Sequence, residues 1–342
     1  KKQGRYSPTS SIVVVSGRVV SVVVVMVQCP AAFSVWRFSL VAICFVVSLA
    51  AENVSMSALE TGLTITSWGQ RWAFAQYAPA SKQPGDSGMN ERLGCESTAL
   101  AQIMYFHGLC PSGSVTYTAP GFSETGMNFS TEAEAYGLCE WDRFAAAPPN
   151  STSAASTKAV ARYIYAASLV LEKKWGTGSY MISHSKSARA TEKHYGVRIK
   201  VVSIMRSATL NDIKEAIMAD IDKNQPLKLH IASKAHSSGH ESTKQYHHVV
   251  VDGYQHKMGR FWVHLNVGHS GYDNDWYDIE KPICLQHYPN GSKPVAGRCA
   301  HYYDDVLYKE LWRIEPVTGA AAAQSAGIAS PLPAANSSTI IV

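Results

Sequence analysis

One cysteine of this sequence lies where proteins make a thiol reactive. Cys95 precedes four side chains with the i, i+3, i+4, i+7 spacing of a helix that buries one face, namely Leu100, Ile103, Met104 and His107. Cys95 would therefore lie in the first turn of a helix over residues 94–107, where free backbone N–H groups and the helix dipole favour the thiolate. A thiolate in that position indicates nucleophilic attack on a carbonyl group.

Three further residues have the types that this chemistry requires. His247, at the start of an expected strand, is the candidate base. Gln70, in Ser-Trp-Gly-Gln, could stabilise the oxyanion through its side-chain amide, together with the backbone N–H of Cys95. Asn266, at the end of the next strand, is placed to orient the imidazole. Each of these residues taken singly more often has a structural role, so the prediction depends on their combination.

The elements that must position these residues change in type along the chain. Apolar spacing and the residues at the segment ends predict helices over 94–107, 154–174 and 210–223. Runs that are β-branched or alternating, separated by Gly, Asn and Asp, predict strands. These strands cover residues 226–232, 247–254, 260–266 and 306–315. Because the helices come first and the strands second, the sequence predicts an α+β fold with an antiparallel sheet.

Three segments of the chain carry a resemblance to a known family. Residues 94–107 (GCESTALAQIMYFH) resemble the nucleophile helix of the streptopain family of papain-like cysteine peptidases, which reads Gly-Cys-x-x-Thr-Ala-x-Ala-Gln-Ile-Met-x-Tyr-His. His247 is followed five residues later by Asp-Gly-Tyr, as in the base segment of that family. Residues 262–271 (WVHLNVGHSG) and the Asp-Trp-Tyr at 275–277 are similar to the segments that follow it.

The resemblance implies a fold and an activity. The fold would be papain-like and two-lobed, with a helical N-terminal half that carries the nucleophile helix and packs against a C-terminal antiparallel β-sheet. The activity would be that of a cysteine endopeptidase, with a thiolate–imidazolium pair formed by Cys95 and His247 and a thioester acyl-enzyme. Neither a metal nor an organic cofactor is expected for it.

The choice between two adjacent histidines follows from the same segment. Side chains of a strand alternate between its two faces, so only one of His247 and His248 can face the cleft. The spacing to Asp252 agrees with the family's base for His247. His248 is then expected to point into the opposite layer.

The sequence also departs from the family pattern. Val267 and His269 stand where the family has tryptophan, so the aromatic wall over the Asn–His pair is expected to be missing. Gln245 and Tyr246 replace glycines that normally precede the base. The segment before Gln70 is shorter than the family's propeptide, so inhibition by a prodomain would have to work differently.

Composition places the chain among folded proteins. Its 342 residues are 46% hydrophobic and 17% charged, enough for a full core. The net charge of +5 is spread without a basic run, which argues against nucleic-acid binding. Eight of the thirteen histidines fall between His230 and His269, which raises a metal enzyme as an alternative. There is no His-Glu-x-x-His, and His236 and His240 lie in a Gly/Ser segment rather than on a helix.

The N-terminus predicts export. Arg37, the apolar run after it and Ser48-Leu49-Ala50 have the order of a secretory signal, with a membrane anchor as the alternative. Signal removal would also remove Cys29 and Cys44 and leave five cysteines, one of which could stay free. The other four allow three pairings, of which short loops favour Cys110 with Cys139 and Cys284 with Cys299. Alternatively, all are reduced and buried.

These observations together give an expected domain organisation. We expect an upstream or disordered segment at 1–25, a signal peptide or membrane anchor at 26–51, a short lead-in at 52–63, the peptidase domain at 64–316 and a disordered Ala/Ser/Pro-rich tail at 317–342. The protein would be a secreted monomer that acts on protein or peptide substrates, without nucleic acid and without stable membrane association after signal removal. Two alternatives stay open: a catalytically weakened papain-like binding module, and a thiol amidase or transglutaminase-like enzyme.

Overall fold

The chain divides into two units that are described separately, residues Lys1–Ala50 and Ala51–Val342. The computed structural model describes residues 11–15, 18–22, 63–64, 66–83, 88–144, 154–234, 245–286, 299, 301–305 and 309–317. In the first unit it describes an antiparallel pair, β1 (Ser11–Val15) and β2 (Arg18–Val22). The expected signal peptide and nearly all of the lead-in and C-terminal extension lie outside the described residues. Within them, no helix combines the length and apolar character needed to cross a membrane.

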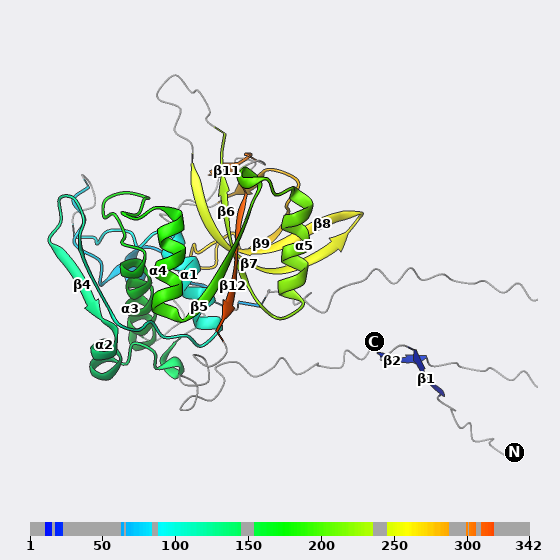
Figure 1. Ribbon diagram of the computed structural model, residues 1–342, viewed down its shortest axis with the longest axis horizontal. Coiled ribbons are helices and arrows are strands. Elements are labelled where there is room, and N and C mark those ends of the chain that lie inside the picture. The colour runs from blue at the N-terminus through cyan, green and yellow to red at the C-terminus, as the bar shows by residue number, and fades with distance from the viewer. Residues whose placement is uncertain are drawn as a thin grey trace, which may run out of the picture. The chain divides into compact units, whose positions relative to one another are not determined.

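A six-stranded antiparallel sheet forms the centre of the second unit (Figure 1). Its strands, in spatial order, are β5 (Val197–Ser203), β12 (Glu310–Pro316), β6 (Leu227–Ala232), β7 (Tyr246–Lys257), β8 (Arg260–Asn266) and β9 (Asp275–Asp278). Each neighbouring pair is antiparallel. The four predicted strands are present, and β5 and β9 complete the sheet on its two edges.

Helices cover both faces of this sheet (Figure 1). Helices α1 (Cys95–Phe106) and α3 (Ala154–Val170) pack in one hydrophobic core, to which β7 contributes Val250. Helix α5 (Leu210–Ile221) packs in a second core with Val249 and Val251 of the same strand. The alternation of neighbouring β7 residues between two cores shows that this strand is buried on both faces.

Two helices differ from their expected form. The sequence predicted one buried face for α1, but residues 96–105 are all buried, because α1 lies between the sheet and α3. The segment predicted as helical over 154–174 ends at Val170. Glu172 has a φ of +49°, which breaks the helix, and the following Lys173 turns into the interior.

The remaining elements are short or polar, and the sequence did not predict them. The hairpin β3 (Ser114–Thr118) and β4 (Glu124–Asn128) leads into α2 (Phe129–Tyr136). Helix α4 (His184–Tyr195) precedes β5, and β10 (Ile283–Leu285) pairs with β11 (His301–Tyr303). Single 3-10 turns are η1 (Trp72–Ala75), η2 (Trp141–Arg143) and η4 (Ile204–Arg206). The fold is therefore the mixed helical and antiparallel arrangement of the papain-like prediction.

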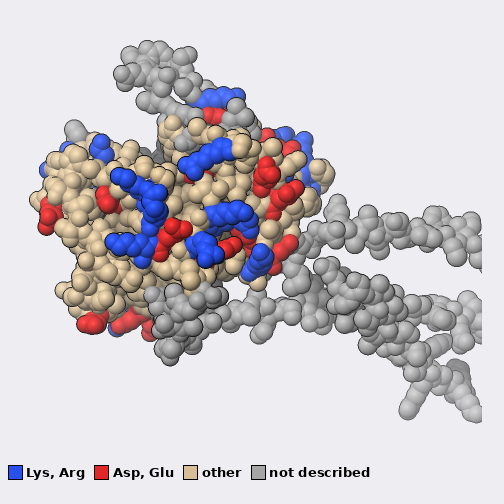
Figure 2. Space-filling view, in the orientation of Figure 1, with Lys and Arg blue, Asp and Glu red and all other residues tan. Residues whose placement is uncertain are grey.

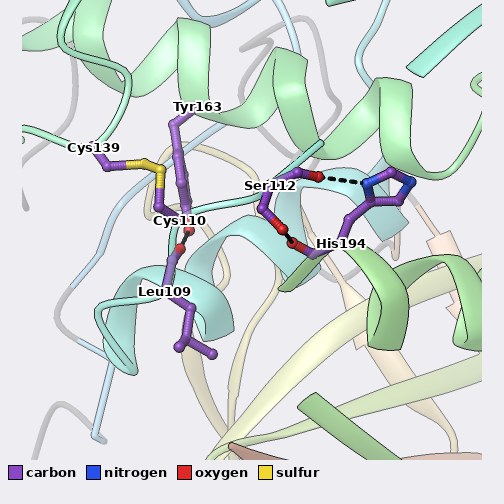
Figure 3. The surroundings of a disulfide bond; sticks show 6 residues. All are labelled: Leu109, Cys110, Ser112, Cys139, Tyr163 and His194. Atoms are coloured by element: carbon purple, nitrogen blue, oxygen red, sulfur yellow. Dashed lines mark hydrogen bonds between the residues drawn. A yellow bond between two sulfur atoms is a disulfide. The ribbon is translucent and has the colours of Figure 1, made fainter. Parts of the chain in front are cut away.

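Two disulfides confirm the pairing that short loops favoured, Cys110–Cys139 and Cys284–Cys299. Figure 3 shows the first of them beside α3, whose Tyr163 donates a hydrogen bond to the Leu109 carbonyl. The same segment is held to α4, since the Nδ1 of His194 bonds to the Ser112 carbonyl at 2.8 Å. This bridge therefore fixes the chain that leaves α1.

Candidate active site

Cys95 is the first residue of α1, and the structure explains why a glycine precedes it. Gly94 has a φ of +93°, and a Cβ there would lie 2.5 Å from the Tyr180 hydroxyl oxygen. That hydroxyl accepts a hydrogen bond at 3.0 Å from the backbone N–H of Ser97, in the first turn of α1. The close approach of Tyr180 thus caps the helix and leaves room only for glycine beside the thiol.

Three of the four predicted residues line one pocket. Cys95, His247 and Gln70 surround a cavity of about 290 Å³. Among the residues that the structure describes, Cys95 is the one cysteine outside a disulfide. The backbone of His248 lowers the pKa of its thiol, so β7 passes beside the sulfur. The first helix and a strand far along the chain therefore meet at this pocket.

The imidazole of His247 has a backbone partner and two ring neighbours. Its Nε2 lies 3.0 Å from the carbonyl oxygen of Val267. Because a neutral imidazole has one N–H, donation from Nε2 leaves the lone pair of Nδ1 free to accept a proton. The rings of His269 and Tyr303 lie 5.0 and 5.8 Å from it. The expected loss of the aromatic wall is thus partly compensated, since an imidazole and a phenol flank His247.

Asn266 makes its hydrogen bonds on the side of β8 that faces α1. Its side-chain amide donates to the Thr66 carbonyl at 2.6 Å, and its oxygen accepts from the Gln102 amide at 2.9 Å. Within the described residues it makes no hydrogen bond to His247, because its side chain points into the layer between β8 and α1. The residue after it, Val267, supplies the partner of the imidazole from its backbone instead.

Gln70 is tied to both sides of the pocket. Its backbone carbonyl accepts a hydrogen bond at 3.0 Å from the N–H of Leu93, just before α1. Its amide nitrogen lies 3.4 Å from the carbonyl oxygen of Gly268. One N–H of the amide is then engaged, and the other stays available to a ligand in the pocket.

Comparison with known proteins identifies the family. Residues 68–277, more than half of the chain, match the model of the peptidase C10 family. The chain belongs to that family. It is the streptopain family of the sequence prediction, and the protein is therefore a cysteine-type peptidase. No curated protein matches the sequence as a relative.

Solved structures of the same fold agree with this assignment. The structure of active wild-type interpain A cysteine protease from Prevotella intermedia is similar to this C10 peptidase with a TM-score of 0.55 and 20% identity. The match covers 74% of this chain and 93% of that chain. A fragment of prointerpain A from the same organism matches with a TM-score of 0.52 and 18% identity, over 74% of this chain and 71% of that one.

The charge states of the pocket of this peptidase are set mainly by burial. Burial raises the pKa of the Cys95 thiol; the His248 backbone and Lys173 lower it, and Glu96 raises it further. Burial also lowers the pKa of His247 well below its ordinary value, and His269 lowers it further. Both directions favour a neutral thiol beside a neutral imidazole in the unliganded pocket, whereas the helix dipole alone predicted a thiolate.

Sequence reasoning missed a buried lysine beside Cys95. Lys173 is fully buried, and its ammonium donates to the carbonyl oxygens of Lys174, Thr177 and Ser179. Burial lowers its pKa to about 8, and interaction with Cys95 raises it. The sequence indicated only that Lys173 and Lys174 end a helix, because two adjacent lysines do not show that one side chain is buried.

Proposed function

We propose that this C10 peptidase hydrolyses peptide bonds with Cys95 as nucleophile, His247 as base and Gln70 as oxyanion donor. The observation that carries the proposal is that these three side chains line one pocket at the start of α1. We assign Asn266 a supporting role, because its side chain bonds to Gln102 of α1 and to Thr66.

The first half of the reaction forms an acyl-enzyme. The Cys95 sulfur attacks the carbonyl carbon while its proton passes to Nδ1 of His247, which creates the thiolate–imidazolium pair during the reaction rather than before it. The Gln70 amide and the Cys95 backbone N–H donate to the oxyanion. His247 then protonates the leaving amine, and the C–N bond breaks to leave a thioester.

The second half regenerates the enzyme. Water attacks the thioester carbonyl, and His247 takes its proton. The C–S bond breaks, the carboxylic acid leaves, and the proton returns to the Cys95 sulfur. The Val267 carbonyl supports both halves, since it holds the imidazole in the tautomer whose Nδ1 can accept a proton.

We further infer a secreted endopeptidase with a catalytic domain over 64–316. Two disulfides support export, because such bonds persist in oxidising compartments. Figure 2 shows Lys and Arg side chains interspersed with Asp and Glu on the face that it presents, which supports protein rather than nucleic-acid substrates. Processing near residue 51 would release this domain.

A peptide-library digest with the parent protein and Cys95→Ala tests the activity and its specificity together. We expect cleavage by the parent, and none by the variant, at sites that mass spectrometry identifies. Tyr136→Ala, an exposed change on α2, is the matched control and should cleave as the parent does. Cleavage that survives the loss of the thiol would refute the assignment.

A weakened binding module is the second candidate, and one observation favours it. Within the described residues Cys95 and His247 share no hydrogen bond, and the pKa directions leave both neutral. Alkylation by iodoacetamide separates the two functions. In a peptidase, alkylation of Cys95 should depend on its base and slow markedly in His247→Asn, whereas in a binding module the rate should be slow and equal in the parent and in His247→Asn.

A further inference from the structure

Three histidines gather behind the proposed nucleophile, on the face of β7 that does not carry His247. His184 begins α4, His230 lies in β6 and His248 lies in β7. One nitrogen from each ring lies within 4.8 Å of the other two. We call these three residues the imidazole cluster. They come from three different elements, so the fold rather than a local motif brings them together.

The register of the sheet explains two of the three positions. Glu310 of β12 pairs with His230, and His230 pairs with His248, so that the three side chains form a row across neighbouring strands. The rings of His230 and His248 stack with their centroids 3.9 Å apart. His184 covers this row from α4, with its ring 5.0 Å from His230 and 5.2 Å from His248.

Carboxylates surround the cluster in the arrangement that metal-binding histidines use. Glu310 bonds to Nδ1 of His184 and also accepts from the indole of Trp312 at 3.1 Å. A carboxylate on the far nitrogen fixes the tautomer and leaves Nε2 as a ligand atom. The carboxylate oxygens of Glu96 lie 3.6 Å from Nε2 of His184 and 3.6 Å from Nε2 of His248. Glu96 is therefore placed to supply a fourth ligand.

The charges around the cluster favour a cation. Glu96 and Glu310 contribute two negative charges, and Lys228 contributes one positive charge through its ion pair with Glu96 at 2.5 Å. Nδ1 of His248 and Nε2 of His184 are buried without a hydrogen-bond partner among the described residues.

We propose that His184, His230 and His248, with Glu96, bind a divalent zinc-type metal ion. Three imidazoles and a carboxylate suit Zn²⁺, whereas Ca²⁺ and Mg²⁺ prefer oxygen ligands. Zn–N bonds of about 2.0–2.1 Å place ligand nitrogens roughly 3.3 Å apart. The three ring nitrogens lie within 4.8 Å of one another, so side-chain rotations would bring them into contact with one ion. The His184 side chain is 27% exposed, which gives the ion a route from solvent.

A bound ion would tie together the elements on which the pocket depends. Glu96 follows Cys95 on α1, and His248 follows His247 on β7. A metal bonded to both would fix the first turn of α1 against the strand that carries the base, and would join α4 to them. Its role is structural, because the ion would lie on the opposite face of β7 from the pocket.

The test measures metal content in the full chain with Cys95→Ala as the parent. This background removes the nucleophile as a metal ligand and makes the result independent of peptidase activity. After exposure to zinc and dialysis, elemental analysis should find about one zinc ion per chain. In addition, His184→Asn keeps an amide N–H in the place of Nδ1 for Glu310 but lacks Nε2, so its zinc content should fall close to zero. His256→Asn, an exposed change in β7, should keep the parental content.

Two further measurements keep the proposal open to refutation if a variant folds poorly. The chelator-stripped parent should bind zinc again and unfold at a temperature about 5 °C higher with zinc present. Cobalt(II) in its place should give the visible absorption of a tetrahedral site without a thiolate band. A stripped parent that is folded but takes up no zinc would overturn the proposal, and so would equal zinc content in the parent and in His184→Asn.

Discussion

The two faces of β7 give adjacent histidines opposite surroundings. The side chains of His247 and His248 are almost equally buried, at 5% and 7% exposure, so burial alone does not distinguish them. His247 faces a pocket, with a backbone carbonyl as its partner and aromatic rings around it. His248 faces a closed layer with another imidazole and the carboxylate of Glu96. A base needs a free lone pair next to a cavity, and only the first environment offers one.

This difference shows how one strand can serve chemistry and architecture at once. Because side chains alternate, the pocket face is open to substrate while the other face joins α1 and α4 to the sheet. The backbone of His248 still lowers the pKa of the Cys95 thiol, so the residue on the structural face also affects the proposed nucleophile. Substitutions on the two faces should therefore affect activity and stability differently.

The pair His247→Asn and His248→Asn tests the comparison directly. Loss of the proposed base should reduce kcat/KM by roughly 10³-fold and leave the melting temperature nearly unchanged. Loss of His248 should do the opposite, with a lower melting temperature and kcat/KM within about tenfold of the parent below that temperature. Kinetics and thermal unfolding on both variants measure this. A larger activity loss in His248→Asn would reverse the assignment.

Gln70→Ala tests the pocket face from its other side. Removal of one oxyanion donor should reduce kcat by about 10²–10³-fold with little change in KM, because the interaction forms in the transition state. Gln76→Ala is the matched control, since the Gln76 amide bonds to the Ala73 carbonyl at 2.8 Å and does not line the pocket. An increase in KM alone would show that Gln70 binds substrate rather than the oxyanion.

Asn266→Ala separates support of the pocket from orientation of the base. The change removes one acceptor of the Gln102 amide and the donor to the Thr66 carbonyl, so the free energy of unfolding should fall by about 1–3 kcal/mol. The pH profile should keep its position, because Val267 holds the imidazole. Asn274→Ala is the informative counterpart, since the Asn274 side chain accepts from the Val267 N–H at 3.0 Å. Asn274→Ala should change the activity more than the stability. A pH profile that is displaced in Asn266→Ala would instead show that Asn266 orients the imidazole directly.

Much of the fold was predictable because its strongest elements carry their own signals. Apolar spacing located α1 and α5, and β-branched runs located β6, β7 and β8. Helix α4 escaped because its buried positions have helical spacing but are mostly small or polar, namely Ser187, Thr191, His194 and Tyr195. A pattern defined by apolar side chains cannot detect such a helix, and the imidazole cluster was missed with it.

The side-chain groups of the candidate site were predictable from the sequence, whereas its backbone groups were not. Cys95, His247 and Gln70 have side chains whose types indicate their chemistry, and the structure gathers them around one pocket. Asn266 was expected to orient the base because its side chain can accept a hydrogen bond. Any residue could provide the carbonyl that Val267 contributes, so the sequence contains no trace of it.

The smallest expected effect comes from the ring that stands beside the base. His269 lowers the pKa of His247 by repulsion between like charges, and His301 does so more weakly. His269→Phe keeps a ring in place but removes the charge, so the pKa of His247 should rise. Because the base acts when unprotonated, the acidic limb of the kcat/KM profile should move to higher pH. His301→Phe should move it in the same direction by less, and a shift to lower pH in either variant would mean that this limb reports another group.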